Sequence, residues 1–260
     1  GDVRVQAVYR DQWNSITKAY RTGSLNAEYK KHIGQSDDFL TIGLQTLYDK
    51  AGTVGLSTTQ FLPALNYHKS LSTERNTYLS AGFMGGVVQR RIDLSKATTN
   101  TDFDGGGLGE NIPNPNYIYL DGSAGMSFNT NLNENPADNM FIGLAYHHFN
   151  KPKNSFFRNP TIELDPKWVA SAGIKFGVTD YSYITIQADH SIQGSFKETV
   201  GGAMYGLKLG ADIENPDYTI HGGLFMRLND ALIPVVKLDY NPFSIAVSYD
   251  VNISKLKPSS

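Results

Sequence analysis

The sequence has no cysteine among its 260 residues. This absence excludes a disulfide framework and a Cys-ligated zinc site. Charged residues make up only 18% of the chain, below the ~25% of typical soluble domains, and the net charge of −2 gives no basic surface for nucleic acid. The longest apolar run is the short stretch ALIPVV, far below the ~18 residues of a membrane-spanning helix. No basic segment followed by an apolar one, as in a signal peptide, opens the chain. Because the sequence begins in mid-pattern, this absence carries no information on compartment.

Alternation of apolar and polar residues is present from end to end, and helical spacing is almost absent. Turn signals such as ENPADN and ENPD separate the alternating segments. No linker or composition shift divides the chain, so residues 1–260 are expected to form a single β-barrel domain. We predict thirteen strands: Val3–Trp13, Tyr20–Ile33, Phe39–Tyr48, Leu56–Tyr67, Thr77–Ile92, Tyr117–Phe128, Met140–Phe149, Trp168–Val178, Tyr183–Ser191, Ala203–Asp212, Thr219–Leu228, Ala231–Tyr240 and Phe243–Ile253.

Most of these strands have one apolar face and one polar or small face. Ile184 and Ile186, for example, oppose Thr185 and Gln187. A soluble β-sandwich alternates in the same way and remains an alternative. Strand lengths of nine to sixteen residues favour a membrane barrel, because globular strands average about five or six residues and membrane strands need about nine to eleven.

Aromatic residues, at 12% of the chain, gather near the predicted strand ends, where a bilayer barrel has its interfacial girdles. We therefore predict an all-β fold, an antiparallel transmembrane outer-membrane β-barrel. Its lipid-facing residues are expected to include Val3, Val5, Ile42, Leu44, Ile142, Leu144, Ile184, Ile186, Phe243 and Ile245.

Several motifs resemble sites of chemistry without meeting their requirements. His147 and His148 are adjacent, but neighbouring side chains of a regular strand point to opposite faces, so they are not expected to share a metal. The segment DFDGGGLGE, with Asp102, Asp104 and Glu110, lacks the ligand spacing of a calcium loop. Its glycines precede no helix that would hold a phosphate. No G-x-S-x-G nucleophile turn is present, and we predict neither catalysis nor a cofactor nor a metal site.

The polar faces of the predicted strands carry charges of both signs. Charges inside a barrel need partners or water. We expect these residues to form a polar network in the lumen that stiffens the wall. The predicted network consists of Arg4, Arg10, Gln12, His147, Lys175, Asp189, Lys208, Asp212, Arg227, Lys237, Asp239 and Asp250.

Two segments resemble a known family. AVYRDQW (Ala7 to Trp13) is similar to the first-strand signature of PorP/SprF outer-membrane proteins of Bacteroidota, with Arg10, Gln12 and Trp13 matching. RLNDALIPVVKLDYNPFSIAVSYDVNISKLK (Arg227 to Lys257) is similar to the C-terminal signature of that family, in its DALIP and SYD stretches and in Asn252, Ser254 and Leu256. Order and spacing agree, so the resemblance covers essentially the whole chain.

The resemblance implies an outer-membrane barrel of the type IX secretion and gliding machinery, without catalytic residues. It implies outer-membrane lipid as surroundings and, as partners, either periplasmic secretion-apparatus proteins or the C-terminal domain of a cell-surface adhesin. Core scaffold and dedicated adhesin anchor both remain open, and an outer-membrane channel is the alternative function. A soluble β-rich binding protein or hydrolase is a third.

Strand number and loop length give two further expectations. Single-chain bacterial barrels have an even number of strands, so the full-length barrel is expected to have about 14, with a missing terminal strand between the first and last strands read here. The alternative is a miscount in Tyr20–Ile33 or Thr77–Ile92. If both termini are periplasmic, the long connections Leu94–Asn116 and Asn150–Pro166 lie outside the cell. The second contains the candidate partner-binding residues Phe156, Phe157 and Arg158, of the residue types that usually anchor interfaces, although they could instead fold back over the lumen.

Overall fold

The computed structural model of the protein describes residues 2–12, 20–34, 36–52, 54–96, 112–133, 138–212 and 215–254. The expectations that concern Trp13, the loop with Asp102, Asp104 and Glu110, and Leu256 fall outside these residues.

The described chain consists of β-strands and one short 3-10 helix, η1 (Leu94–Lys96). Within this part of the chain no helix is long and apolar enough to cross a membrane. The strands are β1 (Val3–Gln12), β2 (Tyr20–His32), β3 (Phe39–Ala51), β4 (Leu56–Ser72), β5 (Thr77–Arg91), β6 (Asn116–Asn131), β7 (Asn139–His147), β8 (Lys167–Thr179), β9 (Ser182–Gln193), β10 (Phe196–Leu209), β11 (Tyr218–Arg227), β12 (Ala231–Tyr240), β13 (Phe243–Ser248) and β14 (Val251–Asn252).

These strands form one antiparallel sheet in which each strand is bonded to its neighbours in sequence, from β1 to β13. This is the strand order of an up-and-down β-barrel. The sheet is not closed, since β1 and β13 are the two ends of the order. The predicted all-β antiparallel fold is confirmed, and the second sheet that a sandwich requires is absent from the described residues.

The fourteen strands occupy thirteen positions, because β13 and β14 both pair with β12 in one continuous register. Pro234 of β12 explains the break between them. The Tyr249 N–H donates to the Pro234 carbonyl at 3.3 Å, but proline has no N–H to return the bond. The predicted strand Phe243–Ile253 is thus one strand interrupted at a proline. The predicted strands Tyr20–Ile33 and Thr77–Ile92 are each a single strand, so neither was miscounted.

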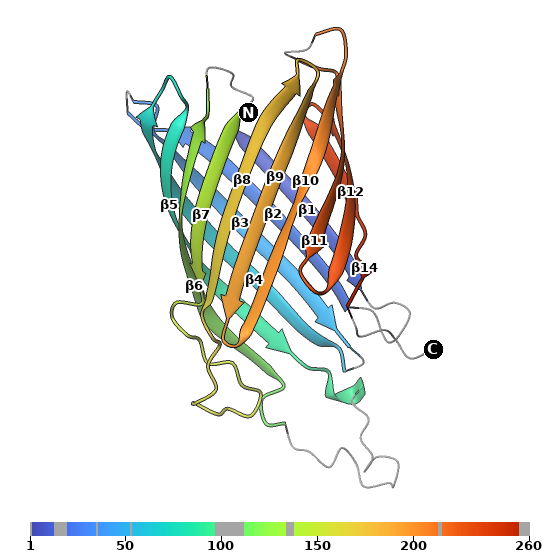
Figure 1. The fold of residues 1–260 in the computed structure, drawn as a ribbon. Helices are drawn as coiled ribbons and strands as arrows, with labels where there is room; N and C mark the ends of the chain where they lie inside the picture. Colours follow the sequence, from blue (N-terminus) through green and yellow to red (C-terminus); the bar gives the residue numbers. More distant parts are fainter. Residues whose placement is uncertain are drawn as a thin grey trace. The chain divides into compact units, whose positions relative to one another are not determined.

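Contacts divide the chain into two compact units. Unit 1 comprises Gly1–Lys69, Ser80–Gly125 and Tyr146–Pro166, and unit 2 comprises Ser70–Leu79, Met126–Ala145 and Lys167–Ser260. In unit 1, β1, β2 and β3 pair along most of their length. In unit 2, β8 to β13 follow one another as a meander, with β8, β9 and β10 side by side in Figure 1. The expectation of a single domain stays a prediction.

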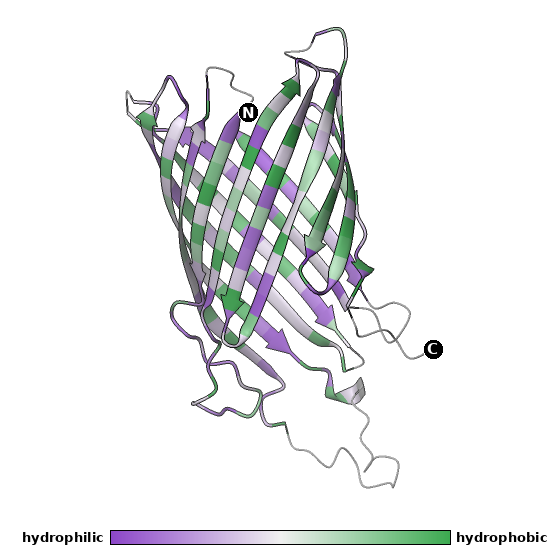
Figure 2. Cartoon of the chain, in the orientation of Figure 1, coloured by the Kyte–Doolittle hydropathy of each residue, from purple (hydrophilic) through white to green (hydrophobic). Residues whose placement is uncertain are grey.

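The two faces of the sheet differ in polarity, as the alternating colours along the strands in Figure 2 show. In β4, exposed Phe61, Pro63 and Leu65 alternate with half-buried Ala64 and Asn66. Buried apolar side chains are few among the described residues, namely Leu62, Val88, Ala231 and Ile233. The chain therefore leaves the apolar face of its sheet uncovered.

The residues expected to face lipid differ in their exposure, although Leu44 shares the face of Ile42 and Ile184 that of Ile186. Leu44 and Ile184 are half-buried. The others are exposed: Val3, Val5, Ile42, Ile142, Leu144, Ile186, Phe243 and Ile245.

Candidate functional site

Asp239 of β12 is the centre of a hydrogen-bond network on the half-buried face of unit 2. Its carboxylate accepts hydrogen bonds from His221 Nε2 at 2.7 Å, from Lys237 Nζ at 2.9 Å and from the Ser244 hydroxyl at 2.5 Å. Because a carboxylate only accepts, the His221 proton lies on Nε2. Strand register accounts for the contacts, since His221 lies opposite Lys237 and Asp239 lies opposite Ser244. The network ties β11, β12 and β13 together.

An aromatic ring extends this network toward β8. The Tyr183 ring of β9 fills the space in which Gly206 of β10 has no side chain. Lys175 Nζ lies 4.0 Å from the centre of that ring, a cation–π contact. The His221 ring meets the same tyrosine edge-on at a centroid distance of 5.7 Å. Polar and aromatic contacts on this face thus run without interruption from β8 to β13.

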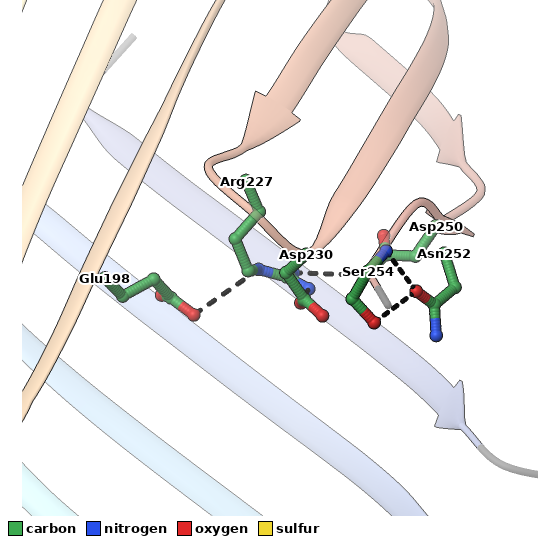
Figure 3. Close-up of polar contacts among 6 residues, drawn as sticks. All are labelled: Glu198, Arg227, Asp230, Asp250, Asn252 and Ser254. Atoms are coloured by element: carbon green, nitrogen blue, oxygen red, sulfur yellow. Dashed lines mark hydrogen bonds and ion pairs between the residues drawn. The ribbon is translucent and has the colours of Figure 1, made fainter. Parts of the chain in front are cut away.

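Arg227, the last residue of β11, has three carboxylates around its guanidinium group (Figure 3). Its Nη1 lies 2.8 Å from Asp230, its Nη2 3.0 Å from Asp250 and its Nε 3.3 Å from Glu198. The carboxylates come from the β11–β12 turn, the gap between β13 and β14, and the start of β10. One cation therefore ties together three separate segments.

The same turn also holds the segment that follows β14 (Figure 3). The Asp230 carbonyl accepts hydrogen bonds from the Ile253 N–H at 2.8 Å and the Ser254 N–H at 3.1 Å. Asn252 Oδ1 accepts bonds from the Ser254 N–H and hydroxyl, each at 2.7 Å. The predicted match at Asn252 and Ser254 therefore corresponds to a fixed turn against the β11–β12 connection.

The other predicted network residues are not gathered into these clusters. Arg4 and Arg10 are exposed on β1, and Gln12 is half-buried at its end. Asp189 accepts hydrogen bonds from Ser171 and Gln187, and Lys208 donates a long one, 3.5 Å, to the Asp180 carbonyl. Asp212 lies beyond the end of β10 and is exposed, because the strand begins and ends earlier than the predicted Ala203–Asp212.

The two adjacent histidines contact the same side of β6. His147 Nδ1 lies 3.0 Å from the Ser123 hydroxyl, and His148 Nδ1 lies 2.7 Å from the buried carboxylate of Asp121. Asp121 and Ser123 are two residues apart and so share a face. His148 lies just past β7 with φ 57°, and this left-handed residue ends the regular alternation. The expectation that the two rings point to opposite faces is wrong for this reason.

In the part of the chain that the structure describes, no group of three or more His, Asp or Glu side chains could hold a metal ion. The His147 and His148 ring centroids are 6.3 Å apart, and each ring has its own hydrogen-bond partner on β6.

Asp138 fixes the connection between β6 and β7. Its carboxylate accepts hydrogen bonds from the Asn133 side-chain amide at 2.7 Å and from the Gly177 N–H of β8 at 2.6 Å. These two bonds stabilise the charged form and lower the pKa of the Asp138 carboxyl below its usual value.

The connection Asn150–Pro166 contains a small hairpin, residues 152–164. The Leu164 N–H donates to the Pro152 carbonyl at 2.9 Å, and the Asn154 N–H donates to the Ile162 carbonyl at 3.0 Å. Lys153 pairs with Glu163 between these two bonds. At the tip, the Ser155 hydroxyl accepts hydrogen bonds from two backbone N–H groups. The connection is therefore an ordered element.

The three residues predicted to bind a partner differ in their exposure at this tip. Phe156 packs inward, edge-on to Tyr117 at 5.0 Å and 5.6 Å below the Arg90 guanidinium. Phe157 is 57% exposed, and Arg158 is exposed with φ 54°. Phe156 thus anchors the hairpin, whereas Phe157 and Arg158 are exposed at its tip.

Sequence reasoning missed two polar clusters of unit 1. Asp38, only 5% exposed, accepts hydrogen bonds from the Tyr67 hydroxyl at 2.6 Å and from Lys69 Nζ at 2.8 Å. Asp38 lies in the connection between β2 and β3, where alternation predicts no contact, although Tyr67 and Lys69 are two residues apart on β4 and therefore share a face.

The second missed cluster lies under the hairpin. Asn154 Oδ1 accepts hydrogen bonds from Arg90 Nη1 at 2.7 Å and from the Tyr117 hydroxyl at 2.6 Å. No sequence signal connects Asn154 with β5 or β6.

A comparison with protein families matches the chain over residues 1–260 to a family described as type IX secretion system membrane protein PorP/SprF. No curated protein and no solved structure matches the chain. The matched family is one of secretion-system membrane proteins and not of enzymes, and a fold made of strands alone fits the outer membrane. The chain is therefore an outer-membrane component of type IX secretion and belongs to the PorP/SprF family.

Proposed function

We propose that this protein is a non-catalytic scaffold of the secretion machinery that also anchors a partner, such as the C-terminal domain of a surface adhesin. In this proposal the exposed apolar face of the sheet contacts hydrocarbon, and the half-buried polar face lines the lumen of a barrel. The observation that carries it is the mutual pairing of charges, as in the three carboxylates around Arg227. Charged groups that are held by ion pairs with one another stiffen a wall and leave few groups for a substrate.

The tip of the 152–164 hairpin is the proposed contact with the partner. Hot spots of protein interfaces are enriched in aromatic and Arg side chains that are held in place before binding. Phe157 and Arg158 are exposed here on a turn that Ser155 closes by hydrogen bonds and Phe156 anchors below. An apolar pocket beside a carboxylate would be complementary to this pair.

Combined substitution of Phe157→Ala and Arg158→Ala tests this contact and leaves Phe156 and the hairpin backbone in place. We expect at least about a tenfold loss of affinity for the partner, measured as cargo retained at the surface of the native cells. The matched control is Phe196→Ala with Lys197→Ala, an exposed aromatic and an adjacent exposed cation at the start of β10. The control variant should retain cargo normally.

Normal attachment by the double Ala variant, with its membrane insertion verified, would place the anchor elsewhere. Selective ion conductance in planar bilayers, with no partner protein recovered from native membranes, would favour the channel alternative.

A further inference from the structure

An apolar groove of about 590 Å³ crosses the exposed face of unit 1. Its wall includes Ile42, Leu65, Phe83, Leu120 and Phe149, whose side chains are between 46% and 68% exposed. These residues come from β3, β4, β5, β6 and the turn after β7. Four adjacent strands at the usual spacing span roughly 14 Å. The volume falls in the range of specific ligand sites, roughly 300 to 1,000 Å³.

Missing side chains explain why the wall is hollow at this point. Gly85 faces the groove from β5 and contributes no side chain, and a Cβ built there would still be 3.4 Å from its nearest neighbour, the Asp121 carbonyl oxygen. Pro63 lines the adjacent part of β4. Phe149 closes one end, because its ring lies over Gly122.

The few polar groups at that end are already satisfied within the protein. The Gly122 N–H donates to Asp121 Oδ1 at 2.9 Å and to Asn150 Oδ1 at 3.1 Å. The Asn150 side-chain amide donates to the Leu120 carbonyl at 2.8 Å, and the second carboxylate oxygen of Asp121 is bonded to His148. A ligand of this groove is therefore recognised by apolar contact.

We propose that the groove is a specific binding site for an acyl chain of an outer-membrane lipid with a phosphate-bearing headgroup. This inference rests on the proposed contact of the exposed face with hydrocarbon, with which the groove is continuous. An acyl chain is apolar and flexible, and it is narrow enough to lie across Gly85 and Pro63. These two residues project less from the sheet than the larger apolar side chains that line the groove. Exposed Lys151 directly follows Asn150 at the closed end, and a lysine there suits the phosphate of the headgroup.

Gly85→Leu tests the site by filling it with a side chain that the backbone accepts. The full chain is delipidated in detergent, dioleoylphosphatidylethanolamine is added back in stoichiometric amount, and bound lipid is counted by mass spectrometry of the intact complex. The wild type should bind one lipid per chain. Gly85→Leu should bind it at least about tenfold more weakly, since displacing a few methylene groups costs that much affinity.

Ala170→Leu is the matched control, because it places the same leucine side chain on the exposed face of β8, outside the groove. It should bind lipid as the wild type does. Absence of a stoichiometric lipid on the wild type overturns the inference, and so does equal binding by the wild type and Gly85→Leu, which would place the lipid elsewhere. Wild-type protein that stays integral to the membrane in either case leaves the proposed function standing.

Discussion

Arg227 differs from Arg21, another arginine in an ion pair, by the number of its partners and by its burial. Its side chain is 18% exposed, whereas Arg21, paired with Asp11 at 3.7 Å, is 63% exposed. Water screens an exposed pair and leaves it little net energy. A partly buried cation with three partners matters more, because its loss leaves several carboxylates close together without a counter-charge.

Arg227→Gln should therefore lower the free energy of unfolding by about 1–3 kcal/mol. Arg21→Gln, the matched control, should lower it by less than about 1 kcal/mol. Urea unfolding of the protein folded into lipid vesicles measures both. Equal effects of the two substitutions would show that the cluster around Arg227 does not stabilise the fold.

Contacts between individual residues could be predicted from the sequence only where the alternation of side chains along a strand decides them. Lys237 and Asp239 are two residues apart on one strand, so their shared face follows from alternation, and the structure joins them. Asp250 likewise keeps the face of Ser244 in the continuous register of β13 and β14 and lies 3.0 Å from Arg227. His148, by contrast, reaches Asp121 only because its left-handed backbone changes the side to which its ring points. Such contacts depend on local departures from the strand, which alternation does not encode.

At the scale of elements, the close approach of β5 to β4 depends on Gly86. A Cβ at this position would overlap the carbonyl oxygen of Phe61, a backbone atom that no rotamer change can move. At Gly23 of β2, by contrast, a Cβ would meet nothing within 4 Å. Glycine thus has a steric role at the first position and none at the second.

Gly86→Ala should accordingly destabilise the protein by about 1–3 kcal/mol or more, the usual effect of overpacking. Gly23→Ala should be neutral or slightly stabilising, since alanine loses less backbone entropy in a strand. The same vesicle unfolding measurement compares them. If Gly86→Ala left the free energy of unfolding unchanged, β4 and β5 would be able to move apart without a loss of stability.

Strand existence could be predicted from the sequence, but strand ends could not. Every predicted strand corresponds to a strand of the structure, because long alternating segments have a clear period of two. β10, however, runs from Phe196 to Leu209, earlier than expected, because KETVGGAM has no strong alternation to indicate a strand. Pro234 has no N–H to donate, and a hydropathy pattern does not show this property. The last strand is therefore divided into β13 and β14 opposite Pro234.

At the scale of the whole molecule, the family and the outer-membrane location were predictable because terminal motifs and alternation agree along the chain. The 152–164 hairpin and the groove beside Gly85 were not, since they depend on strand register and on which side chains are missing at one place. The closing strand that would bring the barrel to fourteen stays a prediction. The paired charges and the uncovered apolar face together support a wall embedded in lipid, and the contact surface at the hairpin stays a proposal.

Cysteine labelling tests this account most directly, because the chain has no cysteine of its own. Two single variants, Phe157→Cys at the hairpin tip and Ile186→Cys on the exposed face of β9, are expressed in the outer membrane of a host without type IX secretion, so that no partner covers the hairpin. The intact cells are treated with a membrane-impermeant maleimide. The account predicts rapid labelling of Phe157→Cys, and labelling of Ile186→Cys only after denaturation, because hydrocarbon covers that face. Equal labelling of the two variants on intact cells, or protection of Phe157→Cys, would contradict it.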